Sequence, residues 1–490
     1  MRWLWMGVGL VLFAGLSGCM VGPNYRAPQA PVPAAWSEAQ PSGAEARAAA
    51  MTQWWTTFKD PLLESLIARA VQSNWDLRTA AGRVREARVL RGVAGADLWP
   101  TINVSGSYTR QRSSENAIPL SLGGASSGTS GGGTPFLRGL KLEQDLFQTG
   151  FDASWEIDLF GGVRRSIEAA DADLAASQED LRNTLVSLLA EVARNYVEVR
   201  GFQRRLAIAQ ENLKAQQDTL ELTRARFNAG LTSELDVTQA ASQLATTQSQ
   251  IPPLETALKQ GIHRLGVLLG QAPGALLEEL STAAPIPSVP PKVPAGLPAE
   301  LLRRRPDIRR AERQLAAATA RIGVAEADLY PKLSLTGSLG LESLKLADLP
   351  QGASRFWSVG PTLSWPIFDA GRIRANIAVQ DARTDQQLST YAQTVLTALE
   401  DVENGLVAYS REQVRRMQLT QAVEANRRAV ALANELYRNG LGTFLNVLDS
   451  ERALFASESD LAQSEATVSS DVVALYKALG GGWETIAPAP

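Results

Sequence analysis

The chain has 490 residues, of which 45% are apolar and 20% charged, and its 48 basic and 51 acidic side chains leave a net charge of −3. These values are typical of an ordered protein and exclude a disordered or collagen-like chain. Because charges of both signs are mixed along the sequence, no basic surface is available to bind nucleic acid.

The sequence also argues against an enzyme. It contains one histidine, His263, and one cysteine, Cys19, which excludes an intramolecular disulfide and a His/Cys cluster for a transition metal. His263 lies in a helical run and in no nucleophile-elbow motif, so a Ser-His-Asp triad is a poor interpretation. Nothing resembles a phosphate-binding loop, and we expect no cofactor and no bound metal.

The amino terminus has the form of a secretory signal. A short positive start is followed by an almost unbroken apolar run from Trp3 to Leu16, and then by Ser17-Gly18-Cys19. The last four of these residues resemble a bacterial lipobox, in which the cysteine thiol receives a diacylglycerol. A signal-anchor helix, or a leader cleaved elsewhere, is the alternative, although the apolar run is slightly short for a bilayer span of about 20 residues.

We therefore expect residues 1–18 to be a lipoprotein signal peptide and Cys19 to be the lipid attachment site. Residues 19–60 would hold a lipid-anchored tether and the start of a further domain, because the segment from Val21 to Pro33 is rich in proline and small residues.

An internal repeat organises the rest of the chain. The segment Ala96–Pro100 returns 231 residues later as Ala327–Pro331, and Phe227–Leu231 returns 210 residues later as Tyr437–Leu441. The offset changes because the first copy carries an extra Gly/Ser-rich stretch, Ser121–Thr134. The expected division is a first repeat at 61–270, a Pro-rich linker at 271–300, a second repeat at 301–479 and a C-terminal tail at 480–490.

Each copy contains two stretches in which apolar and polar residues alternate, as in strands with one apolar face. Each is long enough for a tilted strand to cross a bilayer. Tryptophans near their ends suit an aromatic girdle at the lipid interface, or an ordinary core. Four strands cannot close a membrane barrel, so several protomers must share one. The stretches are about 99–112 and 148–159 in the first copy, and about 330–341 and 356–367 in the second.

Each copy also contains a long helical hairpin, at about 162–268 and about 371–479. Apolar residues recur every seven positions from Leu185 to Phe227, and again from Val395 to Tyr437 with Arg416 as the only polar break. This period predicts a left-handed coiled-coil seam. A helix of about 65 residues is about 100 Å long, which suits a structure that reaches across a space. A filamentous scaffold would share the seam but has no need of membrane-length strands.

Nearly the whole chain after Cys19 resembles the TolC-like and OprM-like outer-membrane factors of tripartite RND efflux systems. Val21-Gly22-Pro23-Asn24-Tyr25-Arg26-Ala27-Pro28 resembles the start of the NodT-type lipoprotein branch, and Leu301-Leu302-Arg303-Arg304-Arg305-Pro306-Asp307-Ile308 resembles the signature that opens the second repeat. The resemblance implies a mainly α fold with a transmembrane β-barrel. A homotrimer would form a 12-stranded outer-membrane barrel, a 12-helix periplasmic α-barrel and a small mixed equatorial domain.

The resemblance implies a passive exit duct for drugs or other small toxic compounds. Its partners would be a periplasmic adaptor, an inner-membrane proton-driven pump and outer-membrane lipid. The alternatives are a duct for type I protein secretion and a non-channel, lipid-anchored coiled-coil scaffold.

Two groups of site residues follow from the resemblance. The hairpin turns are the points farthest from the strands and would dock the adaptor, with solvated turns that bind no partner as the alternative. Their residues are Asn228, Gly230, Leu231, Asn439, Gly440 and Leu441. The periplasmic gate would comprise Leu445, Asn446, Asp449, Asp236 and Tyr437, with Leu445 and Asp449 on one helix face at i, i+4. Asp236 and Tyr437 would hydrogen-bond between neighbouring coils. Some family members have a second Asp where this chain has Asn446. A solvated Asp449 and a Leu445 in the seam are the alternative.

Overall fold

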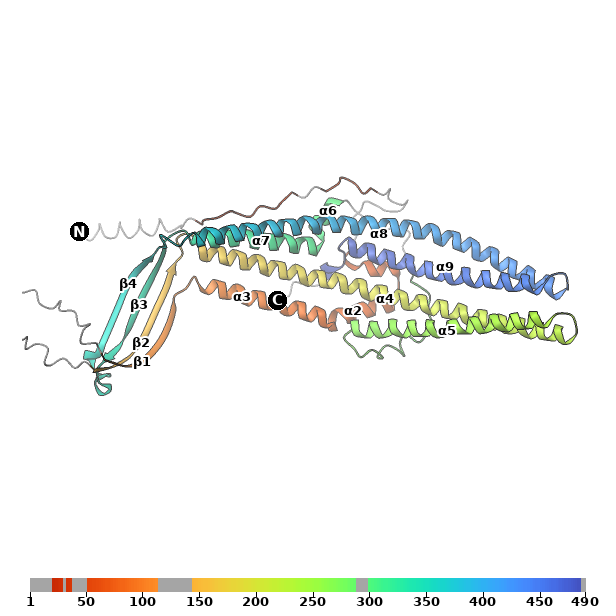
Figure 1. Ribbon diagram of the computed structural model, residues 1–490, viewed down its shortest axis with the longest axis horizontal. Coiled ribbons are helices and arrows are strands. Elements are labelled where there is room, and N and C mark those ends of the chain that lie inside the picture. The colour runs from red at the N-terminus through yellow and green to blue at the C-terminus, as the bar shows by residue number, and fades with distance from the viewer. Residues whose placement is uncertain (1–19, 30–31, 38–50, 113–142, 288–297, 486–490) are drawn as a thin grey trace, which may run out of the picture. The chain divides into compact units, whose positions relative to one another are not determined.

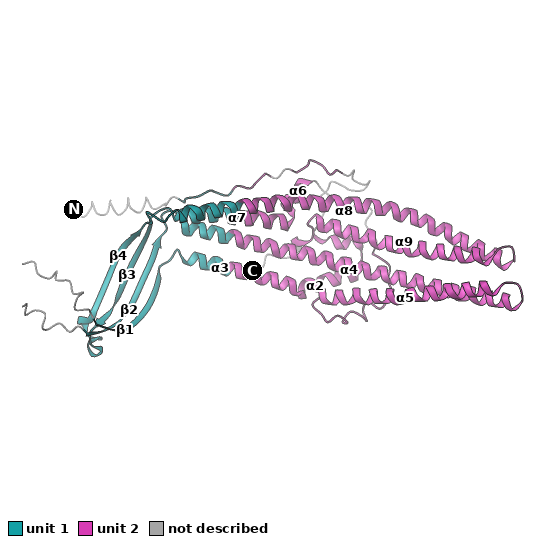
Figure 2. Ribbon diagram, in the orientation of Figure 1, with its two compact units in different colours: residues 1–25, 89–171, 316–384 teal, residues 26–88, 172–315, 385–490 magenta. Residues whose placement is uncertain are grey.

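The computed structural model describes residues 20–29, 32–37, 51–112, 143–287 and 298–485. The expected signal peptide, Cys19 and the Gly/Ser-rich stretch lie outside these residues. The chain divides into two compact units, coloured separately in Figure 2. Unit 1 comprises residues 1–25, 89–171 and 316–384, and unit 2 comprises residues 26–88, 172–315 and 385–490. Among the helices of the described ranges, none is both long and apolar enough to cross a membrane.

Helices and strands follow each other twice in the same order, as labelled in Figure 1. The strands are β1 (Thr101–Arg112), β2 (Glu143–Ile157), β3 (Lys332–Ser343) and β4 (Arg355–Ser364). The α-helices are α2 (Pro61–Ser73), α3 (Trp75–Ala96), α4 (Gly162–Asn228), α5 (Glu234–Leu268), α6 (Pro298–Arg304), α7 (Pro306–Ala327), α8 (Arg372–Arg438) and α9 (Phe444–Ala478). The short 3₁₀ segments are η1 (Met51–Phe58), η4 (Leu346–Asp348), η5 (Gly352–Ser354) and η6 (Trp483–Thr485).

Unit 1 contains a four-stranded antiparallel sheet in the order β1-β2-β3-β4. Its strands differ from the expected ranges at their ends. β2 begins at Glu143, about five residues earlier than expected, because its polar start pairs with the end of β1, where Arg110 and Glu143 form a 3.1 Å ion pair. β4 ends at Ser364, before the expected residue 367, because Pro366 has no N–H to continue the ladder.

Unit 2 is built around a hydrophobic core between η1 and the helices. Trp54 is 1% exposed, and its ring stacks on Tyr476 of α9 at 5.2 Å between centroids. Asp60 caps α2 by accepting hydrogen bonds from the first-turn amides, and it also accepts one of 2.7 Å from the hydroxyl of Tyr196 on α4. Burial, and then this hydrogen bond to Asp60, raise the pKa of Tyr196 to about 12.

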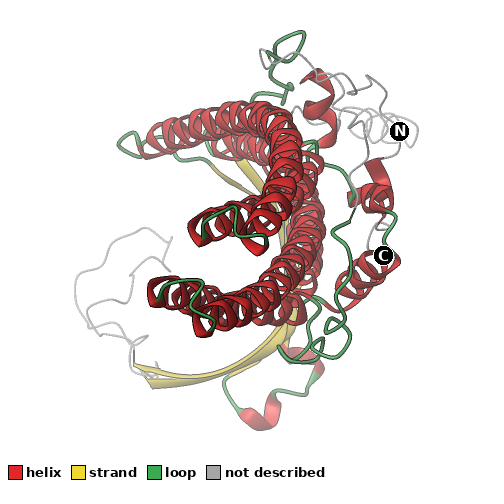
Figure 3. Ribbon diagram, turned by 90° about the vertical axis from the view of Figure 1, so that its right-hand side faces the viewer, coloured by secondary structure: helices red, strands yellow, loops and turns green. Residues whose placement is uncertain are grey.

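Unit 2 also contains the greater part of the long helices, which Figure 1 shows in two pairs, α4 with α5 and α8 with α9. Seen end-on in Figure 3, the helices of this unit lie in a curved layer. The predicted seven-residue seam is buried along most of its length, which confirms that part of the sequence prediction. Its buried members are Leu185, Val192, Val199 and Leu220 in α4, and Val395, Val402, Tyr409, Val423 and Tyr437 in α8.

Candidate functional site

One face of the sheet in unit 1 is apolar and exposed. The strand register places Val104, Phe151, Leu339 and Trp357 opposite one another in a single row across all four strands. All four side chains are exposed, from 55% for Phe151 to 74% for Trp357. A contiguous apolar row of this kind needs an apolar environment or a partner.

The residues next to this row point to the opposite face, as the two-residue period of a strand requires. One of the two neighbouring rows is polar in all four strands and consists of Asn103, Asp152, Ser338 and Ser358. Ser105 donates a 3.0 Å hydrogen bond to Asp152 across β1 and β2, and Ser338 lies 2.7 Å from Ser358 across β3 and β4, oxygen to oxygen. The sheet therefore separates an apolar surface from a hydroxyl- and carboxylate-bearing one.

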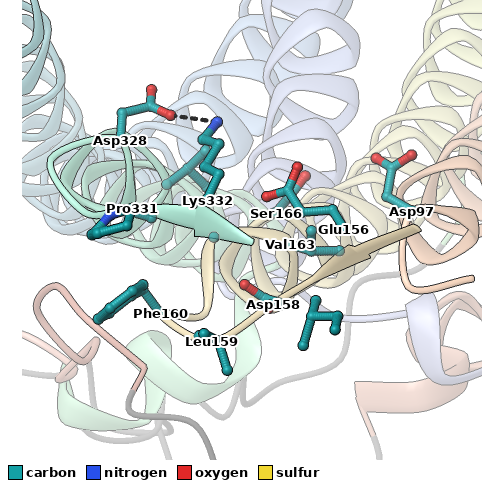
Figure 4. A pocket seen from close by; sticks show the side chains of 14 residues that line it. Asp97, Glu156, Asp158, Leu159, Phe160, Val163, Ser166, Asp328, Pro331 and Lys332 are labelled. Carbon is teal, nitrogen blue, oxygen red and sulfur yellow. Dashed lines mark ion pairs between the residues drawn. The ribbon is translucent and has the colours of Figure 1, made fainter. Parts of the chain in front are cut away.

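A cavity of about 230 Å³ lies within unit 1 where β2 turns into α4 (Figure 4). Its lining includes the carboxylates of Asp97, Glu156, Asp158 and Asp328, of which Asp97 and Asp328 are repeat equivalents. Asp328 is paired with Lys332 at 2.8 Å. Across the described ranges, no three His, Cys, Asp or Glu side chains are grouped so that they could hold a metal ion.

The two hairpin turns of unit 2 have the same backbone geometry. In the first, Leu231 N–H donates to the Arg226 carbonyl at 2.9 Å, and Gly230 has φ +74°. In the second, Leu441 N–H donates to the Leu436 carbonyl at 2.8 Å, and Gly440 has φ +73°. This six-to-one hydrogen bond over a left-handed glycine is the Schellman arrangement that ends a helix.

Both turns present apolar side chains to solvent. Leu231 is 66% exposed and Leu441 is 77% exposed, while Asn228 and Asn439 are also exposed. An exposed leucine at the same place in both turns gives the tips a matched pair of contact points.

The expected gate residues at the start of α9 lie on its exposed side. Leu445 is 52% exposed, and Asn446 and Asp449 are exposed beside it. The buried side of the same turns is formed by Phe444, Val447 and Leu448. Within one chain, Leu445 thus lies outside this buried cluster, and its place in the gate stays a prediction.

The structure does not bring Asp236 and Tyr437 together within one chain. Asp236, in the first turn of α5, accepts a hydrogen bond from the hydroxyl of Thr232, which lies just before that helix. Tyr437 is 3% exposed, and its hydroxyl is buried with no hydrogen-bond partner among the described residues. A contact between neighbouring protomers stays a prediction.

Two residues near this tip were not identified from the sequence. The Arg226 guanidinium lies 4.6 Å from the centre of the Tyr437 ring and donates to the Arg438 carbonyl, so it joins the ends of α4 and α8. Glu451 in α9 is 7% exposed and accepts a 2.9 Å hydrogen bond from Thr219 of α4. Burial raises the pKa of Glu451. Neither residue sits in a repeated motif, so the pattern that revealed the turns could not reveal them.

Comparisons with known proteins cover almost the whole chain. A family model described as "Outer membrane efflux protein" matches residues 66–271 and 297–481. Nodulation protein T of Rhizobium leguminosarum bv. trifolii is 33% identical over 480 residues, which cover 97% of each chain. The solvent efflux pump outer membrane protein SrpC of Pseudomonas putida is 34% identical over 472 residues, 96% of each chain. The solved outer-membrane channel OprN is 37% identical, with a TM-score of 0.84 over 95% of this chain and all of that one.

Proposed function

The chain belongs to the outer membrane efflux protein family and is an efflux channel of the outer membrane. From this premise we propose that it is the passive exit duct of a tripartite, proton-driven pump. It conducts drugs or other small toxic compounds, received from a periplasmic adaptor and an inner-membrane pump, to the exterior. The relative SrpC is named as part of a solvent efflux pump, which supports a small apolar cargo. The duct carries out no reaction of its own.

The observation that carries this proposal is the two-faced sheet of unit 1. Its apolar row suits lipid, while the opposite face, with its serines and carboxylate, suits an aqueous lumen. The strands β1 and β4 lie at the two ends of the strand order, so each has an edge to pair. Unpaired edges are not tolerated in lipid, and three copies of a four-stranded sheet close a 12-stranded barrel.

The same reasoning extends to the helices. In the proposed homotrimer, the four long helices α4, α5, α8 and α9 of each copy form a 12-helix periplasmic α-barrel. A small equatorial domain would be formed from the segment before α2, the linker at 271–300 and the C-terminal tail. The proposed division is the one expected from the repeat: 61–270 and 301–479 as the two family repeats.

The functional ends of the duct are proposed on the geometry of the tips. Leu231 and Leu441, with the asparagine and glycine of each turn, dock the adaptor. Leu445 and Asp449 face the axis and form the narrowest point. Cys19 carries the lipid anchor, which assists membrane attachment and is separate from conduction.

The test is a measurement of conductance by the purified full-length trimer in a planar bilayer, together with drug resistance in cells that lack the chain. In the bilayer, we expect the trimer to conduct ions with a preference for cations. In cells, we expect the chain to restore drug resistance only when the pump and the adaptor are also present. A folded, membrane-inserted protein that conducts no ions would leave a scaffold as the better interpretation. Secretion of a protein substrate without any change in drug resistance would favour the type I duct.

A further inference from the structure

The segment that directly follows the lipid-attachment cysteine is held against unit 1 by a buried arginine. Arg165, in the first turn of α4, is 1% exposed. Its Nε donates to the Val21 carbonyl at 2.9 Å, and its Nη2 donates to the Gly22 carbonyl and to Oδ1 of Asn24, both at 2.9 Å. The fourth bond, from Nη1, goes to Glu168 at 2.7 Å, which balances the buried charge.

The backbone of the segment is fixed from a second side. Val21 N–H donates to the Phe160 carbonyl at 3.1 Å, in the turn between β2 and α4. Both polar groups of the Val21 backbone are therefore satisfied by the body of unit 1. A surface tether with no fixed position would leave these groups to water.

Three glycines provide the space for this contact. A Cβ on Gly161, which has φ +81°, would meet the Met20 Cγ at 2.6 Å. A Cβ on Gly22, which has φ +89°, would meet the Gly323 Cα of α7 at 2.4 Å. A Cβ on Gly323 would in turn meet Arg165 Nε at 2.8 Å. Each glycine is thus required by close approach, and two of them also by their backbone conformation.

We propose that Arg165, Gly161 and Gly323 form an anchor seat that binds residues Met20–Asn24 and so fixes where the lipid anchor joins the protein. The inference rests on the proposed acylation of Cys19, which is joined to Met20 by one peptide bond. Arg165 is a positioning residue: it holds the segment behind the acylated cysteine at the turn between β2 and α4. The acyl chains then enter the bilayer at one defined place beside the sheet.

The seat also gives a role to residues 21–24, to which the channel function assigns none. In the run Val21-Gly22-Pro23-Asn24, Val21 supplies a backbone donor and a backbone acceptor, and Asn24 supplies the side-chain acceptor. Gly22 supplies a second backbone acceptor and the left-handed close approach. Nothing in the structure explains Pro23.

Limited trypsin digestion of the full-length protein in outer-membrane vesicles tests the seat. The first basic residue after Cys19 is Arg26, whose side chain is exposed. To cut there, the protease must draw the preceding residues into its cleft, so a seated segment resists cleavage. The rate is read by mass spectrometry as the appearance of the new terminus at Ala27.

Arg165→Met should speed this cleavage at least tenfold, because it removes every donor to the segment and keeps the side chain's apolar stem. Gly22→Val breaks the seat from the side of the segment and should act in the same direction without touching α4. The matched control is Arg91→Met in α3 of the same unit, whose guanidinium donates to Asp171 at 2.9 Å. It should cleave like the wild type.

We expect the conductance of Arg165→Met to stay as in the wild type, whereas a general structural role for Arg165 in the channel would change it. Equal protection in Arg165→Met, Gly22→Val and the wild type would overturn the seat. Equal loss of protection in Arg91→Met would overturn the assignment to Arg165. Radiolabelled fatty acid reports acylation separately: an unlabelled wild type would refute the lipid anchor, while the cleavage rates alone decide the seat.

Discussion

Trp365 donates its indole N–H to the carbonyl oxygen of Leu329 over 3.0 Å. The first repeat contains the same bond, from Trp155 to the Leu98 carbonyl at 2.9 Å. In each copy the tryptophan comes from the second strand region and the leucine from the Leu-aromatic-Pro segment that precedes the first strand. Both repeats therefore share the strand pattern and also this hydrogen bond, which joins the start of each β-hairpin to its end.

Replacement of Trp365 by Phe should lower the free energy of unfolding by about 1 kcal/mol, because the Leu329 carbonyl loses a donor while the aromatic ring is kept. The measurement is the midpoint of urea unfolding in detergent. Trp357→Phe is the control, since that ring is 74% exposed on the apolar face. A midpoint for Trp365→Phe equal to that of the control would contradict a stabilising role for the bond.

A half-buried carboxylate in α9 makes stability depend on pH. Burial, and then the nearby charge of Glu412, raise the pKa of Asp471 to about 6, and its Oδ2 has no hydrogen-bond partner in the described part of the chain. The folded state thus holds this proton more tightly than the unfolded chain, whose carboxyl keeps a pKa of about 3.9. The protonated Asp471 carboxyl therefore stabilises the folded state. This contribution is complete below pH about 3.9 and is lost as pH rises through about 6.

Asp471→Asn should therefore be more stable than the wild type at pH 7, and the two should converge near pH 4. The measurement is the thermal midpoint of both proteins across this range. Asp460→Asn on the same helix is the control, since that side chain is exposed. Parallel curves for Asp471→Asn and the wild type would show that Asp471 titrates normally.

Much of the fold could be predicted because its signals are periodic. The seam from Leu185 to Phe227 recurs every seven residues, and most of it is buried. Phe227 is 40% exposed and lies at the tip of the hairpin, directly before the turn. The strands follow from their two-residue alternation. Their ends could not be placed as well, because they depend on pairing partners in the neighbouring strand. At the start of β2, Glu143 faces Arg112 of β1 and forms an ion pair with Arg110.

Contacts between segments that lie far apart in the chain could not be predicted from the sequence. Pro252 and Pro253 would ordinarily end a helix, because proline lacks the N–H donor, yet α5 continues from Glu234 to Leu268. Burial of Ile262 and Leu265 in the core holds the second half in place. Arg165 likewise carried no signal, because its partners lie 141 to 144 residues earlier in the chain.

At the glycines of the hairpin tips, the effect of backbone strain can be tested separately from the effect of steric crowding. A Cβ added at Gly440 meets nothing within 4 Å, so only its φ of +73° opposes a substitution. Gly440→Val should cost about 1 to 2 kcal/mol and weaken crosslinking to the adaptor, because a β-branched residue resists the left-handed conformation. Gly440→Asn is the matched control, since asparagine tolerates that conformation. Unchanged resistance and crosslinking in Gly440→Val would argue against the turn as a docking tip.

The gate is tested by substitutions on the exposed side of α9 and at its proposed latch. If Asp449 faces the axis, Asp449→Ala removes one negative charge per protomer from the narrowest point and should reduce cation selectivity. Asp460→Ala, at an exposed position further along α9, should leave cation selectivity unchanged. Tyr437→Phe removes only the hydroxyl, which is buried and has no hydrogen-bond partner within the described part of one chain. We expect Tyr437→Phe and Asp236→Ala each to raise the bilayer conductance of the resting channel, and their combination to add little if both belong to one bond.

Leu445→Ala should widen the same constriction without altering selectivity. If these variants, singly and together with Asp449→Ala, conduct as the wild type does, the constriction lies elsewhere in the duct.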